Sequence, residues 1–137
     1  SRSSAASDVY KRQILLWSLT EDSKLSQKAI DIISNNDNKL YYSIASVWEI
    51  EIKNSLGKMP ITGEELCVYC KEAGYDLLEI KEKHIFNLKS LTRIEGAPKH
   101  NDPFDRIMLS QAKTDNYGFV THDSLIQYYI EPCVIYV

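Results

Sequence analysis

Acidic residues gather in one short stretch, KHNDPFDRIMLSQA, at residues 99–112. Asp102 and Asp105 flank a Pro-Phe pair, and Arg106 follows directly. Carboxylate oxygens bind hard divalent cations such as Mg²⁺ or Mn²⁺, which activate water for attack on a phosphodiester. The stretch also has a structural interpretation, because Asp before Pro is a strong helix start and both carboxylates then stabilise the first turn. On this segment alone, capping is the favoured interpretation.

Two further acids are expected at the ends of strands. Asp123 follows the strand predicted within residues 118–123, and Glu49 lies one turn into a helix that follows the strand predicted at residues 39–44. Because sites in such folds lie at the carboxyl ends of the strands, Glu49, Asp105 and Asp123 are expected to converge. Two carboxylates about 5 Å apart repel by roughly 3 kcal/mol at an effective dielectric constant of about 20. A bound Mg²⁺ or Mn²⁺ is the natural compensation for this repulsion.

The elements that would position these residues alternate along the chain. Helices are predicted at residues 14–19, 24–36, 47–57, 63–74 and 82–91, and again from 103 onward. Strands are predicted at residues 39–44, 75–80, within 118–123 and at 133–137. Ser46 is the expected N-cap of the helix at 47–57. This order predicts an α/β sandwich around a mainly parallel central sheet.

Composition limits the classes of protein to consider. The chain has 137 residues, 44% of them hydrophobic, which suffices for the core of one domain. Its formal net charge of -3 argues against binding nucleic acid through a broad basic face, so any such contact must be local. No apolar run approaches the roughly 20 residues of a membrane span, and we expect a cytoplasmic protein without membrane contact. Cys67 and Cys70 form an isolated C-x-x-C pair, which indicates buried or half-buried thiols in a helix.

The beginning of the chain differs from the rest. Residues 1–13 are small and polar, whereas apolar periodicity is nearly continuous from Ile14 onward. We therefore expect residues 1–13 to be a non-native or disrupted leader and residues 14–137 to form a single domain.

Three segments, residues 46–61, 100–112 and 118–123, resemble in their order and spacing the PIN-domain ribonucleases of the VapC toxin type. Residues 14–33 resemble the segment that follows the first strand of that family. The resemblance implies a PIN-like three-layer α/β/α sandwich. It also implies a metal-dependent endoribonuclease of a toxin–antitoxin pair, which uses Mg²⁺ or Mn²⁺, has RNA as substrate, binds a cognate antitoxin and forms a homodimer.

The resemblance also assigns roles to individual residues. Glu49, Asp105 and Asp123 match the family's catalytic, metal-binding acids. Asp102 would be an accessory acid or a cap, and Thr121 matches a hydroxyl residue beside the last acid that orients a water or a phosphate.

Two neighbours of these acids receive more modest expectations. Arg106 is expected to brace the site or a neighbouring carboxylate. His100 is expected to be a solvent-facing loop residue, with proximity to a phosphate as the alternative.

One position departs from the family pattern. The family's first strand ends in an acid, and alignment places Lys11 at that point. Asp8 is a poor substitute, because an offset of three residues along a strand turns the side chain to the opposite face. Either the protein is an inactive member, or the leader replaces the true first strand. The alternative functions are a catalytically dead PIN-fold module that binds an antitoxin or RNA, and a flavodoxin-like phosphoacceptor domain, which needs an acid pair that the chain lacks after its first strand.

Overall fold

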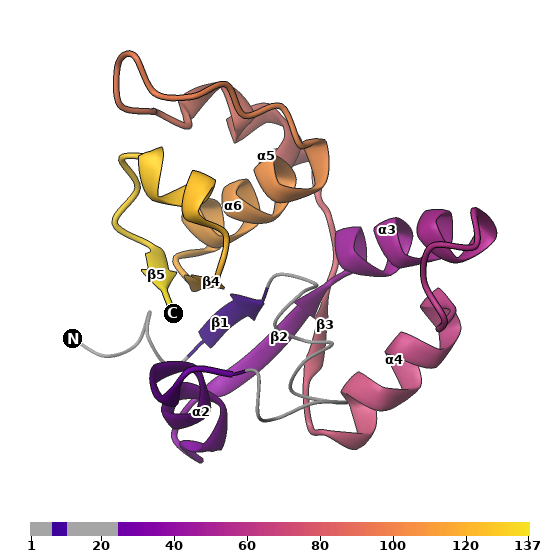
Figure 1. Cartoon of the computed structure of the whole chain (residues 1–137). Helices are drawn as coiled ribbons and strands as arrows, with labels where there is room; N and C mark the ends of the chain where they lie inside the picture. Colours follow the sequence, from indigo (N-terminus) through magenta and orange to yellow (C-terminus); the bar gives the residue numbers. More distant parts are fainter. Residues whose placement is uncertain (1–6, 11–24) are drawn as a thin grey trace.

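The computed structural model describes residues 7–10 and 25–137 (Figure 1). Five strands form one sheet in the order β3-β2-β1-β4-β5, and every neighbouring pair is parallel. The strands are β1 (Ser7–Tyr10), β2 (Lys39–Ser43), β3 (Asp76–Leu78), β4 (Gly118–Thr121) and β5 (Val134–Tyr136). The predicted parallel sheet is therefore confirmed.

Helices cover both faces of this sheet. The α-helices are α2 (Gln27–Ser34), α3 (Ile44–Ser55), α4 (Gly63–Glu72), α5 (Glu82–Phe86) and α6 (Pro103–Asp115). Two short 3-10 helices, η2 (Asn87–Ser90) and η3 (Ser124–Tyr128), complete the described elements. In Figure 1, α5 and α6 lie on the side of the sheet opposite to α2 and α4.

Alternation along the strands produces two cores. Val120 of β4 belongs to one buried cluster with Tyr42 of β2 and Leu66 of α4, whereas its neighbour Phe119 belongs to another with Met108 of α6. Successive side chains of a strand point to opposite faces, so each face buries its own set of apolar residues. The predicted three-layer α/β/α sandwich is confirmed.

The strand order defines where a site is expected. From the central strand β1 the chain builds β2 and β3 toward one edge, and β4 and β5 lie toward the other. In open parallel sheets, ligands bind outside the carboxyl ends of the strands at such a switch point, here between β1 and β4. The segment after β4 and the start of α6 position the candidate site.

Helix α3 begins earlier than the sequence predicts. Its N-cap is Ser43, the last residue of β2, whose Oγ accepts a hydrogen bond from Ala45 N at 3.0 Å. Ser46 lies inside α3, fully buried, with Oγ 3.3 Å from Met108 Sδ. The prediction that Ser46 caps this helix is wrong, because strand β2 passes into α3 without a loop.

The predicted domain start at residue 14 leaves out a strand. Ser7–Tyr10 form β1, paired on both sides with β2 and β4. Whether residues 1–13 are native stays a prediction, and the helix predicted at 14–19 lies outside the described residues. Among residues 7–10 and 25–137, no helix is long and apolar enough to cross a membrane.

Candidate active site

The N-terminus of α6 carries the acidic stretch. Asp102 is the N-cap, and its Oδ1 accepts hydrogen bonds from Phe104 N at 2.9 Å and Asp105 N at 3.1 Å. Pro103 occupies the first helical position, where its missing N–H costs nothing. The capping role predicted for Asp102 is confirmed. Asp105, in the first turn, is only 2% exposed and lies at the positive end of the helix dipole.

Asp123 follows β4 directly, as the sequence predicts. Its backbone N–H donates to the Oγ1 of Thr121, the buried last residue of that strand, at 3.1 Å. Asp123 Oδ1 accepts from Leu125 N at 2.9 Å, which caps η3. Thr121 thus fixes the backbone of the last acid, and its predicted contact with a water or a phosphate stays a prediction.

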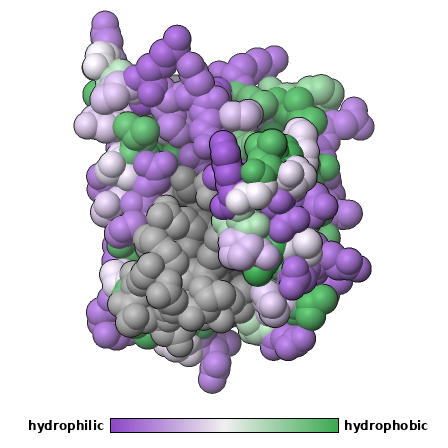
Figure 2. All heavy atoms as spheres, turned by 45° about the vertical axis from the view of Figure 1, so that its right-hand side comes forward, coloured by the Kyte–Doolittle hydropathy of each residue, from purple (hydrophilic) through white to green (hydrophobic). Residues whose placement is uncertain are grey.

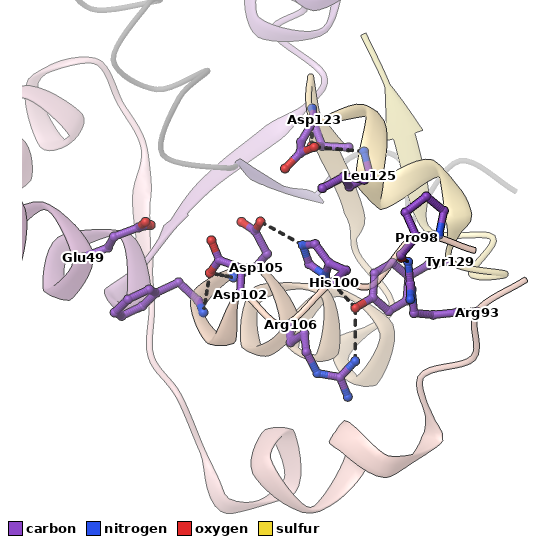
Figure 3. A network of polar contacts seen from close by, with 12 residues as sticks. Glu49, Arg93, Pro98, His100, Asp102, Asp105, Arg106, Asp123, Leu125 and Tyr129 are labelled. Atoms are coloured by element: carbon purple, nitrogen blue, oxygen red, sulfur yellow. Dashed lines mark hydrogen bonds and ion pairs between the residues drawn. The ribbon is translucent and has the colours of Figure 1, made fainter. Parts of the chain in front are cut away.

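His100 is a site residue that the sequence analysis placed at the surface. It is 7% exposed, with Nε2 3.3 Å from Asp105 Oδ2 and Nδ1 2.9 Å from the Tyr129 hydroxyl (Figure 3). The expectation of a solvent-facing histidine is wrong, because Tyr129 packs over the loop that carries it. The one available signal was its position two residues before the N-cap of α6.

Together these residues form a compact group of potential ligands. His100, Asp105 and Asp123 each offer one ligand atom, and these atoms lie within 4.8 Å of one another. Two carboxylate oxygens suit a hard divalent cation such as Mg²⁺ or Mn²⁺, and an imidazole nitrogen is compatible with several transition metals. The donor set therefore fits the divalent cation that the sequence predicts.

Glu49 comes from a different helix. It is buried in α3, and its Oε2 lies 3.4 Å from the Nζ of Lys53, one turn further along the helix. Figure 3 shows Glu49 on the far side of Asp102 and Asp105 from His100 and Asp123. Glu49 does not belong to the described 4.8 Å group, and its share in a cation site stays a prediction.

Arg106 supports the site through an aromatic residue. Its Nη1 donates to the Tyr129 hydroxyl at 3.1 Å and its Nη2 to the Leu88 carbonyl oxygen at 3.5 Å. Tyr129 in turn contacts His100. Arg106 is therefore connected to Asp105 through Tyr129 and His100, which supports the prediction that it braces the site.

By the resemblance, the first-acid position is Lys11, the residue that follows β1 in the sequence. Lys11 lies outside the described residues. The backbone of Asp8 is paired with Leu40 and with Gly118, the first residue of β4, so it lies three residues from the strand end that carries Thr121. This register supports the inference that Asp8 does not replace the missing acid.

Comparisons with known proteins identify the fold. No protein-family model and no curated protein matches the chain. The chain is similar to one in the crystal structure of VapBC2 from Rickettsia felis bound to a DNA fragment from their promoter, with 16% identity and a TM-score of 0.66 over 96% of this chain and 97% of that one. It is also similar to a chain of a toxin-antitoxin complex from Klebsiella pneumoniae, with 12% identity and a TM-score of 0.59 over 93% and 95%. The chain therefore has a PIN-like fold, which it shares with these chains of two toxin–antitoxin complexes.

Proposed function

We propose that this chain, which shares its fold with chains of two toxin–antitoxin complexes, is a metal-dependent endoribonuclease of the toxin–antitoxin type. The observation that carries the proposal is the group formed by His100, Asp105 and Asp123 at the switch point of a parallel sheet. Two acids this close, one buried and one half-buried, are expensive to maintain without a function, because like charges repel strongly where water is partly excluded.

Each site residue has its own role in the proposed reaction. Asp105 and Asp123 would hold Mg²⁺ or Mn²⁺, with Glu49 facing them from α3. A bound cation of this type neutralises phosphate charge and activates water for hydrolysis. Asp102 fixes the start of α6, and Thr121 fixes the backbone of Asp123, so both carboxylates keep their positions while RNA binds.

Partners and location belong to the same proposal. Trp48 and Ile52 of α3 and Leu56, its C-cap, recur every four residues and are 59%, 39% and 63% exposed. Figure 2 shows apolar side chains among hydrophilic ones on the face that lies to the right in Figure 1. Such exposure supports a protein partner, either an antitoxin or a second copy in a homodimer. The three cysteines are free, in accord with a cytoplasmic protein.

The test is cleavage of single-stranded RNA in the presence of Mn²⁺. If Lys11 occupies the first-acid position, the chain as written cleaves poorly and Lys11→Asp restores activity, because a positive charge is replaced by a ligand. Asp8→Asn should matter little in either background. Robust cleavage by the unmodified chain would show that Lys11 is not disabling, and no cleavage in either background would contradict the nuclease proposal.

The second candidate function is a PIN-fold module without catalysis. Lys11 at the first-acid position favours it, since an ammonium group opposes a cation. Thermal melting with Mn²⁺ separates the two functions, because an enzyme with an intact site is stabilised by the ion and a bare module is not.

A further inference from the structure

Polar contacts run in a continuous line behind Asp105 (Figure 3). Arg106 Nη1 lies 3.1 Å from the Tyr129 hydroxyl, which lies 2.9 Å from His100 Nδ1, and His100 Nε2 lies 3.3 Å from Asp105 Oδ2. Tyr129, His100 and Asp105 are all buried. Hydrogen bonds are stronger in such surroundings, and a mismatched donor or acceptor is costly.

The two ends of this line fix the direction of its hydrogen bonds. Arginine has donors only, so the Tyr129 oxygen accepts from Arg106. An ionised carboxylate only accepts, so Asp105 Oδ2 needs a donor, and His100 Nε2–H is in place to provide it. In a neutral imidazole the other nitrogen is then an acceptor, and Nδ1 takes the hydroxyl hydrogen of Tyr129. The opposite neutral tautomer would set an Nε2 lone pair against the carboxylate.

We infer that His100 and Tyr129 are positioning residues for Asp105, which hold its Oδ2 in one orientation at the cation site. The inference rests on the proposed nuclease function. With a hydrogen on Nε2, His100 offers no lone pair toward the cation, so it acts on the carboxylate and not as a ligand. Loss of such an outer hydrogen bond typically costs about 10- to 100-fold in metal affinity or activity.

Tyr129 is held firmly enough for this role. The Arg93 guanidinium lies 5.2 Å from the centre of its ring, and Arg93 also donates to the carbonyl oxygen of Pro98, two residues before His100. The rings of His100 and Tyr129 meet edge to face, with centroids 5.5 Å apart and planes at 88°. These contacts fix the loop, the ring and the hydroxyl together, so the imidazole has little freedom to rotate.

Histidine ¹⁵N NMR tests the tautomer without any metal or substrate. The chain has three histidines, and His84→Gln and His100→Gln assign the signals. At mildly alkaline pH, where imidazole is neutral, His100 is expected to carry its hydrogen on Nε2. Tyr129→Phe removes only the hydroxyl, so it should weaken this preference and shift the Nδ1 resonance. A hydrogen on Nδ1 in the unsubstituted chain would overturn the inference and make His100 a candidate ligand.

Mn²⁺ affinity, measured by calorimetric titration of the Lys11→Asp chain, tests the consequence. His100→Ala should weaken binding by about 10- to 100-fold. His100→Gln should retain most of the affinity, because its amide N–H can reach the same carboxylate oxygen, and His84→Ala, which alters a buried histidine outside the site, should leave affinity unchanged. Equal losses in His100→Ala and His100→Gln would contradict positioning by a hydrogen bond. No Mn²⁺ binding by the Lys11→Asp chain would count against the nuclease proposal instead, and the tautomer would still decide the inference.

Discussion

Each end of helix α6 carries an aspartate that contacts a buried histidine from another segment, and the two histidine–aspartate pairs differ in what surrounds them. At the N-terminal end, His100 Nε2 lies 3.3 Å from Asp105 Oδ2. At the C-terminal end, His84 Nε2 lies 3.0 Å from Asp115 Oδ2, and His84 Nδ1 accepts from Lys81 N at 2.9 Å. Each imidazole therefore faces a carboxylate with one nitrogen and a neutral group with the other.

The two carboxylates have neighbours of opposite charge. Lys83 Nζ lies 2.8 Å from Asp115 Oδ1, so the C-terminal pair includes a full cation. This compensation is needed, because the negative end of the helix dipole disfavours a carboxylate there. At the other end, a second acid, Asp123, approaches Asp105 and His100 to within 4.8 Å. One aspartate thus has a cationic partner, whereas the other lies beside a second acid, as the proposed cation site would need.

The largest expected effect separates the two aspartates by activity. In the Lys11→Asp chain, Asp105→Asn should reduce Mn²⁺-dependent RNA cleavage by about 100-fold or more, because a ligand is lost where charge stabilisation supplies several kcal/mol. Its melting temperature should stay nearly unchanged. The matched variant Asp115→Asn should keep full cleavage and lose stability. An Asp105→Asn chain that unfolds would return this residue to a capping role.

The next effect concerns stability at the C-terminal pair. His84→Ala should lower the free energy of unfolding by about 3 kcal/mol, since it empties a fully buried site, leaves the Lys81 N–H without its acceptor and removes one of the two partners of Asp115. Urea denaturation measures this change. His122→Ala, at an exposed histidine, is the control and should stay within about 0.5 kcal/mol. Similar losses of unfolding free energy in both variants would show that His84 stabilises the fold no more than an exposed histidine does.

Mn²⁺ should stabilise the folded chain through the residues at the N-terminal end of α6 and not through those at its C-terminal end. With Mn²⁺ at about 100 times its dissociation constant, the Lys11→Asp chain should gain about 2.7 kcal/mol of stability. Asp123→Asn and Glu49→Gln should reduce this gain, and Asp115→Asn should not. Thermal melting over a Mn²⁺ titration gives the answer. Full stabilisation of the Glu49→Gln variant would exclude Glu49 as a ligand.

The smallest expected effect is a difference in acid stability. Burial alone would raise the pKa of Asp115, but hydrogen bonds from Lys83 and His84 outweigh it and hold the pKa below the usual 3.8. A carboxyl with a lowered folded pKa contributes stability that is present above its unfolded value and is lost as the pH falls through the folded value. Free energies of unfolding below about pH 4 should therefore fall less steeply for Asp115→Asn than for the parent chain. If the free energy of unfolding fell equally steeply with pH in both chains, the lowered pKa of Asp115 would not contribute to acid stability.

The signals that predicted the fold are local in the sequence. Asp102 and Pro103 mark the start of α6, and the apolar strand before Asp123 marks β4. Caps and apolar periodicity depend on residues only a few positions apart, so they survive in the sequence as readable patterns. The order of helices and strands then implied the parallel sheet, and with it the prediction of three acids, Glu49, Asp105 and Asp123, at one edge.

Strand β1 was missed for a related reason. A central strand of four residues, SDVY, shows no periodicity that separates it from a polar leader. Its identity comes from pairing with β2 and β4, whose residues lie about thirty and more than a hundred positions away.

The sequence by itself determined the order of the elements, and it predicted that Glu49, Asp105 and Asp123 converge; the structure brings Asp105 and Asp123 close together. The tertiary structure decided that His100 joins them and that His84 serves the opposite end of the same helix. His100 meets Tyr129 across 29 positions, and His84 meets Asp115 across 31. Burial of a polar side chain depends on what packs over it and which partner lies within hydrogen-bond distance, and the packed sheet and helices determine both.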